Sequence, residues 1–328
     1  MTSLNYSSWT SITSTADWSA RYGPASVVYD NKIFVMGGYT GSRVNDVWSS
    51  LDGANWVEVT DGAGWSVRDY HSSVVYDNKI FVMGGNAGSA RVNDVWSSLD
   101  GANWVEVTDS AGWSGRNGHA SVVYENKIFV MGGYTGSTRF HDVWSSSDGA
   151  AWVEVTNGAG WSARNHHKSV IYDNKMFVMG GYTGSTKYND VWSSSDGAIW
   201  IEVNSASDWS GRYAHASVVY DNKIFIMGGI VDSRVNDVWS TVDGVNWVEV
   251  TGGAGWSARN SHAIVVFDNN IFVMGGYDGA NYYNDVWSMD VEYGPGPPSS
   301  LEEKTIGAVW IATHFVLVGY AAIGYLNN

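Results

Sequence analysis

The chain has 328 residues, with 39 Gly, 19 Trp, 19 Tyr and no Cys. The absence of Cys excludes disulfide scaffolds, thiolate metal sites and Cys nucleophiles. Aromatic residues make up 14% and charged residues 16%, the reverse of a disordered composition. The formal net charge of −15 repels a phosphate backbone, so nucleic acid is not an expected partner.

One unit occurs six times along the chain. Each unit has an apolar run that ends in a Gly-Gly pair, and successive pairs are 47 or 48 residues apart. A constant period of this size is typical of a solenoid or a propeller. The pairs begin at Gly37, Gly84, Gly132, Gly180, Gly228 and Gly275.

The second unit shows the expected elements in chain order. Segments 72–76, 80–84, 93–97 and 104–108 are short, rich in Val, Ile, Phe, Tyr and Trp, and bounded by Asn, Asp and Gly. This pattern indicates four strands, here called a, b, c and d, joined by tight turns. The c–d connection reads Ser-x-Asp-Gly-x-x-Trp in the first unit and predicts such a turn.

The fixed positions of the unit resemble the kelch repeat. They are Arg-x-x-His before strand a, Gly-Gly after strand b, Asn-Asp-Val-Trp in strand c, and a Trp eight residues later. The resemblance covers about residues 8–293 and implies an all-β, six-bladed kelch-type β-propeller over residues 1–293.

The two ends of the repeat array predict how the ring closes. The sixth unit has Pro295 where the Trp of strand d should fall, and the segment that begins at Trp9 aligns with the strand d that begins at Trp56. The N-terminal segment is therefore expected to supply the outer strand of the last blade. Closure of this kind removes an exposed sheet edge.

Two rings of polar residues recur before strand a. An Arg in every unit is expected to be structural, with contact to an anionic ligand as the alternative. A His recurs in five units, and no metal site is predicted from it because a ring of blades holds these residues apart. The Arg residues are Arg21, Arg68, Arg116, Arg164, Arg212 and Arg259, and the His residues are His71, His119, His167, His215 and His262.

The d–a and b–c connections vary from unit to unit. An up-and-down blade of four strands places both connections at one end of the propeller, and Tyr and Arg suit recognition surfaces there. Divergence of these loops without function is the alternative. The predicted binding face comprises Tyr22, Tyr39, Arg43, Tyr70, Arg91, Tyr134, Arg139, His166, Tyr182, Tyr213, Arg234, Tyr277 and Tyr282.

No catalytic residue is predicted. Kelch-like copper oxidases use a Tyr–Cys cross-link, which a chain without Cys cannot form. The iron-binding Glu-x-x-x-Asp-x-x-x-His pattern of kelch specifier proteins is also absent. A kelch-type sugar epimerase or mutarotase remains an alternative, because its acid and base could lie in the variable loops.

The sequence changes character after residue 293. Residues 294–304 form a Pro- and Gly-containing linker, and residues 305–328 are predicted to form a transmembrane helix, since 306–326 carry no formal charge. Small residues suit packing on another helix, and a His at this depth could ligate haem or a pigment. These residues are Ala308, Ala312, His314 and Gly319. No other cofactor is predicted.

Together these features predict a non-enzymatic interaction or scaffold propeller, anchored to a membrane by one C-terminal helix. The expected partners are membrane lipid and other protein subunits of a larger membrane complex, in which this chain is an accessory subunit. A glycan-binding surface propeller is the alternative. The side of the membrane stays undetermined, because Lys304 is the one cation flanking the helix.

Overall fold

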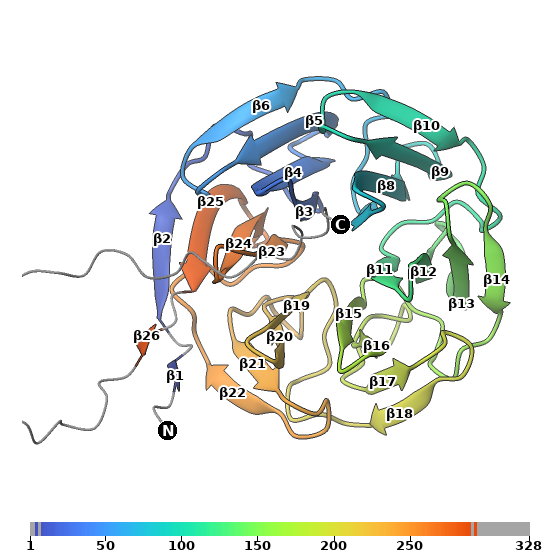
Figure 1. Cartoon of the computed structure of the whole chain (residues 1–328). Coiled ribbons are helices and arrows are strands. Elements are labelled where there is room, and N and C mark those ends of the chain that lie inside the picture. The colour runs from blue at the N-terminus through green and yellow to red at the C-terminus, as the bar shows by residue number, and fades with distance from the viewer. Residues whose placement is uncertain (1–3, 6–7, 290–291, 294–328) are drawn as a thin grey trace, which may run out of the picture.

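The computed structural model describes residues 4–5, 8–289 and 292–293. Six antiparallel sheets of four strands each are arranged radially about a central axis (Figure 1). This architecture confirms the predicted all-β, six-bladed propeller. The predicted linker and transmembrane helix lie outside the described residues. Within the described residues, no helix is long and apolar enough to cross a membrane.

Each blade has four strands, counted from the central axis outwards. The innermost strands are β3 (Ala25–Tyr29), β7 (Ser72–Tyr76), β11 (Ala120–Tyr124), β15 (Lys168–Tyr172), β19 (Ala216–Tyr220) and β23 (Ala263–Phe267). The second strands are β4 (Lys32–Tyr39), β8 (Lys79–Asn86), β12 (Lys127–Tyr134), β16 (Lys175–Met179), β20 (Lys223–Met227) and β24 (Asn270–Tyr277).

The outer half of each blade follows the same order. The third strands are β5 (Arg43–Ser50), β9 (Arg91–Ser98), β13 (Arg139–Ser146), β17 (Val191–Ser194), β21 (Val238–Thr241) and β25 (Tyr282–Met289). The outermost strands are β6 (Trp56–Thr60), β10 (Trp104–Thr108), β14 (Val153–Thr156), β18 (Ile201–Asn204), β22 (Val248–Thr251) and β2 (Trp9–Thr13). Two short strands pair apart from the blades, β1 (Leu4–Asn5) and β26 (Glu292–Tyr293).

Ring closure occurs as predicted. Strand β2 pairs antiparallel with β25, with Trp9 opposite Met289, and completes the sixth blade (Figure 1). The ring of Trp9 packs edge-on against Trp256 with centroids 5.9 Å apart. The N-terminal strand β2 is therefore the fourth strand of the last blade, and every blade has four strands.

Strands b and c of the second unit are longer than predicted. The predicted segments 80–84 and 93–97 are extended in the structure, because β8 continues through the Gly-Gly pair and still bonds to β9. Both glycines have positive φ, 58° at Gly84 and 112° at Gly85, and the register shifts between Met83 and Gly85. A Cβ on Gly85 would lie 2.8 Å from the Cβ of His71, so only Gly fits there.

The blades are joined by apolar contacts between neighbours. Trp65 is 1% exposed and packs edge-on against Trp104, with ring centroids 5.9 Å apart. The cluster around Trp65 contains Val27 and Met36 from one blade and Val82 from the next. Tryptophan therefore fills the space between blades, as large aromatic side chains do in cores.

The six recurrent Arg residues are structural, as expected. Arg164 is 0% exposed and makes a two-pronged pair with Asp190, with Nη1 2.5 Å from Oδ1 and Nη2 2.8 Å from Oδ2. It also donates to the carbonyl oxygens of Ser162 and Gly180. A guanidinium this deeply enclosed is not available to an anionic ligand. Equivalent pairs join Arg21–Asp46, Arg68–Asp94, Arg116–Asp142, Arg212–Asp237 and Arg259–Asp285.

The c–d connections are tight turns, as predicted. In the third blade the N–H of Gly149 donates to Ser146 Oγ at 2.8 Å, and the N–H groups of Ala150 and Ala151 donate to Asp148 Oδ1. The N–H of Ala151 is the largest influence that lowers the pKa of Asp148. The motif therefore stabilises its own turn with side-chain oxygens.

Candidate binding face and central cavity

The d–a and b–c connections of every blade meet at one end of the propeller. An isolated antiparallel bridge joins them in each blade, as between Tyr22 and Tyr39, where the N–H of Tyr22 donates to the carbonyl of Tyr39 at 3.1 Å. The equivalent bridges are Asp69–Asn86, Asn117–Tyr134, Asn165–Tyr182, Tyr213–Ile230 and Asn260–Tyr277. The two sets of variable loops thus form one face.

A closed ring of backbone hydrogen bonds surrounds the centre of this face. One residue of each blade donates its N–H to the carbonyl of the equivalent residue in the preceding blade, at 2.7–3.0 Å. All six residues have φ between 54° and 62°. We call them the mouth ring: Gly23, Tyr70, Gly118, His166, Ala214 and Ser261.

The side chains of Tyr70 and His166 lie over the mouth ring rather than on the open loops. Their ring centroids are 4.5 Å apart, and the hydroxyl of Tyr70 lies 3.2 Å from Ser261 Oγ, two blades away. A Cβ on Gly23 would lie 3.1 Å from the Tyr70 ring. This aromatic pair therefore narrows the opening inside the mouth ring. The sequence predicted both residues on the binding face but did not predict that they lie over its centre.

All the predicted aromatic residues of the face except Tyr134 form a continuous strip across it. Tyr22 is its hub, with ring centroids 5.2 Å from Tyr39, 5.6 Å from Tyr70 and 5.4 Å from Tyr282. On the far side of the mouth, His166 contacts Tyr213 in turn. Burial raises the pKa of Tyr22 to about 12. The aromatic strip comprises Tyr277, Tyr282, Tyr39, Tyr22, Tyr70, His166, Tyr213 and Tyr182.

The predicted Arg residues of the face bridge neighbouring blades. Arg139 Nε donates to Asn165 Oδ1 of the next blade at 3.0 Å, and its guanidinium lies 4.5 Å from the ring centroid of Tyr134 and 5.3 Å from that of Tyr182. These cations therefore link the loops of neighbouring blades, and Arg43, Arg139 and Arg234 also lie beside rings of the aromatic strip. The equivalent Nε contacts are Arg43–Asp69, Arg91–Asn117 and Arg234–Asn260.

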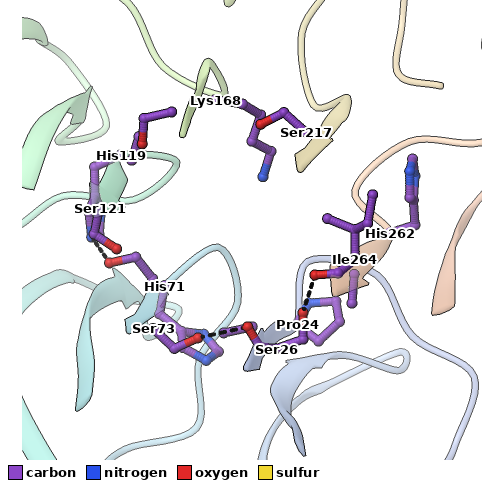
Figure 2. A pocket seen from close by; sticks show the side chains of 15 residues that line it. Pro24, Ser26, His71, Ser73, His119, Ser121, Lys168, Ser217, His262 and Ile264 are labelled. Atoms are coloured by element: carbon purple, nitrogen blue, oxygen red, sulfur yellow. Dashed lines mark hydrogen bonds between the residues drawn. The ribbon is translucent and has the colours of Figure 1, made fainter. Parts of the chain in front are cut away.

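A cavity of about 210 Å³ lies at the inner ends of the blades (Figure 2). It is lined by the first residues of the innermost strands and by three of the recurrent His residues, His71, His119 and His262. Neither ring nitrogen of His71 or His262 has a hydrogen-bond partner in the described part of the chain. In the part of the chain that the structure describes, no group of three or more His, Asp or Glu is placed to hold a metal ion.

Burial keeps the recurrent histidines neutral. It lowers the pKa of His71, His119 and His262 to about 3, and the pKa values of His167 and His215 lie well below their ordinary value. These five histidines bind protons near pH 6.5 in the unfolded chain but not in the folded chain, so stability falls as pH drops below about 6.5.

We expect the propeller to be acid-sensitive before its carboxylates titrate. Each histidine removes about 1.4 kcal/mol of unfolding free energy per pH unit between about pH 6.5 and its folded pKa. Urea midpoints at pH 7.5, 6.5 and 5.5 measure this slope. The variant H71Q should have a shallower slope below pH 6.5 by about one proton, and an unchanged slope would contradict the assignment.

Sequence reasoning missed two elements of this region. The mouth ring is made by backbone groups of chemically different residues, so no side-chain pattern marks it. Lys168 lines the cavity, but the strand pattern of the unit did not distinguish it from its neighbours. A comparison of the six units could have revealed Lys168, because the equivalent position in the other five units holds Ala or Ser.

The fold and this arrangement of loops define a kelch-type propeller, and comparison with protein families agrees. The family model for the KLHDC2/KLHL20/DRC7 Kelch-repeats domain matches residues 1–147, 103–247 and 200–295. The chain belongs to this Kelch-repeat family. No curated protein sequence matches the chain. Kelch propellers are commonly protein-interaction domains and are typically non-enzymatic.

The predicted tail residues are not part of the described face. Ala308, Ala312, His314 and Gly319 lie outside the described residues, so helix packing and the alternative haem or pigment ligation at His314 stay predictions. The binding roles assigned to the Tyr, Arg and His residues of the face also stay predictions.

Proposed function

We propose that this protein is a non-enzymatic interaction propeller that binds a protein partner through the aromatic strip and is held at a membrane by residues 305–328. In this role it is an accessory subunit of a larger membrane complex. The observation that carries the proposal is the unbroken contact of aromatic side chains across one face of the disc. Tyrosine is enriched where protein interfaces concentrate their binding energy.

The construction of the face supports a rigid docking surface. Tyr39 is the last residue of β4 and Tyr277 the last residue of β24, the second strands of their blades. An isolated bridge also joins each of them to the d–a connection of its blade. Arg234 lies 4.7 Å from the ring centroid of Tyr277 and is itself tied to the next blade. Side chains ordered before binding lose little entropy when a partner arrives.

The tail supplies the argument for the membrane. Its uncharged run of 21 residues, 306–326, would span roughly 31 Å as a helix. Trp310 lies near one end and Tyr325 near the other, where interfacial aromatics are favoured.

The first experiment is purification of the tagged full-length chain in detergent, beside a chain lacking residues 301–328. We expect other membrane subunits to accompany the full chain and to be lost from the truncated one. A full-length chain that stays soluble and monomeric without detergent would remove the basis for membrane anchoring.

The second experiment tests the face. In the same purification, the double variant Y39A/Y282A should lose the partner, with a weakening of roughly 30-fold for each hot-spot tyrosine. The matched control is L99A, because Leu99 is 63% exposed and lies at the c–d end of its blade. Equal retention of the partner by both variants would place the interface elsewhere. Glycan binding lost in Y39A/Y282A would instead support the lectin-like alternative.

A further inference from the structure

Lys168 breaks the repeat at the centre of the propeller. It is the first residue of β15, and the same position in the other five blades carries no charge. The equivalent residues are Ala25, Ser72, Ala120, Ala216 and Ala263. Because the blades are otherwise near copies, a single Lys at this position is a departure that the propeller fold itself does not need.

The side chain of Lys168 projects into the central cavity (Figure 2). Its ammonium makes no hydrogen bond or ion pair with any residue that the structure describes, and no Asp or Glu is among the residues that line the cavity. An unpaired charge in a partly buried site is costly unless another group compensates it. Among the residues that the structure describes, the cavity therefore holds no counter-charge for this cation.

The residue after Lys168 belongs to a ring of hydroxyls. Five innermost strands carry Ser at their second position, and the sixth carries Ile264. Ser26 Oγ donates to the carbonyl of Ile264 at 3.1 Å, so that hydroxyl is engaged within the protein. By contrast, the hydroxyls of Ser169 and Ser217 are buried and have no hydrogen-bond partner among residues 4–5, 8–289 and 292–293. These two uncommitted donors belong to the same blade as Lys168 and to the next one.

The charge of Lys168 acts on the histidines around the cavity. Burial lowers the pKa of His119, His215 and His262 most, the recurrent Arg of each blade lowers it further, and Lys168 adds to this effect. Burial also lowers the pKa of Lys168 itself. A small negative ligand would relieve the desolvation of the ammonium and supply an acceptor for the two free hydroxyls.

We propose that the central cavity binds one small oxyanion, held by the ammonium of Lys168 and the hydroxyls of Ser169 and Ser217. The ligand class is a tetrahedral or planar oxyanion such as phosphate, sulfate or a short carboxylate. The cavity of about 210 Å³ is far larger than the roughly 10–15 Å³ that one water needs, so an ion fits with part of its hydration.

The test uses the full-length chain with inorganic phosphate as the probe. Phosphate should raise the melting temperature in a saturable way at pH 7, beyond the effect of chloride at the same ionic strength. Phosphorus NMR line broadening should report the same dissociation constant. Sulfate and acetate, added as competitors, distinguish a preference for a tetrahedral ion from a preference for a carboxylate.

Variants separate this site from general surface binding. K168M should abolish saturable phosphate binding, and S169A/S217A should weaken it by at least roughly tenfold. K175M, which removes an exposed cation from the same blade, and S26A, whose hydroxyl is already engaged, should bind phosphate within twofold of the parent.

The stability of K168M without phosphate provides a second measurement. Removing an uncompensated cation should leave this variant at least as stable as the parent in chloride buffer. Phosphate binding that persists in K168M, or an effect of phosphate on the parent no larger than that of chloride, would overturn the proposal. A folded K168R variant that still binds phosphate would support it.

Discussion

Replacing Asp190 with Asn is expected to lower the free energy of unfolding by about 3–5 kcal/mol. The guanidinium of Arg164 is 0% exposed, and the two oxygens of Asp190 accept from Nη1 and Nη2. Trp192 Nε1 also donates to Asp190 Oδ2 at 2.9 Å. An Asn in this place removes the counter-charge and points an N–H donor at other donors, which leaves a buried cation unpaired. The shift of the urea midpoint at constant pH measures this loss.

A nearby ion pair offers a matched control for D190N. Lys187 Nζ lies 3.3 Å from Asp232 Oδ1, and the Asp232 side chain is fully exposed. Exposed pairs contribute little to stability, so D232N should leave the urea midpoint unchanged. If D190N and D232N had the same urea midpoint, the buried Arg–Asp pairs would not be a main source of stability.

Deleting residues 1–13 is expected to lower and broaden the unfolding transition of the propeller. The deletion removes β2, exposes the edge of β25, and removes the contact of Trp9 with Trp256. Trp9 is partly buried and packs against a core cluster that includes Trp256, so its loss adds to the loss of the strand. Calorimetry and gel filtration should show a lower, broader transition and self-association through the open edge.

A shorter deletion, of residues 1–7, is the control because it leaves β2 in place. It should unfold like the full chain. Addition of a peptide of residues 1–20 to the longer deletion should restore the transition, since the missing strand can be supplied in trans. A deletion of residues 1–13 that melts within about two degrees of the full chain would contradict closure by β2.

The sequence was sufficient to predict the propeller and its closure. The Gly-Gly pairs and the Trp at fixed spacing repeat without interruption, and the missing strand d of the last unit has its match at Trp9. These signals are strong because the same structural requirement recurs in every blade. Gly84 marks a position with positive φ, and Trp65 marks a position where an aromatic side chain is buried between sheets. Family membership followed from the same residues.

The site was predictable only in part, for physical reasons. The one-face arrangement of the loops followed from strand order, but the depth of Tyr70 and His166 depends on the width of the mouth ring, which pattern alone does not give. The bridging role of Arg139 depends on a neighbour 26 residues away in the next blade. Lys168 was visible in the printed sequence, and its isolation became clear only when the cavity around it was known.

The mouth ring has an electrostatic consequence. Its six N–H groups all donate in the same rotational sense, so each peptide dipole points at the next around a closed circle. The tangential components of such dipoles cancel, whereas the aligned dipoles of a helix add and leave partial charges at its ends. These six bonds therefore contribute no pole along the axis. The charge at the centre is therefore left to side chains, and Lys168 is the one Lys, Arg, Asp or Glu among the residues that line the cavity.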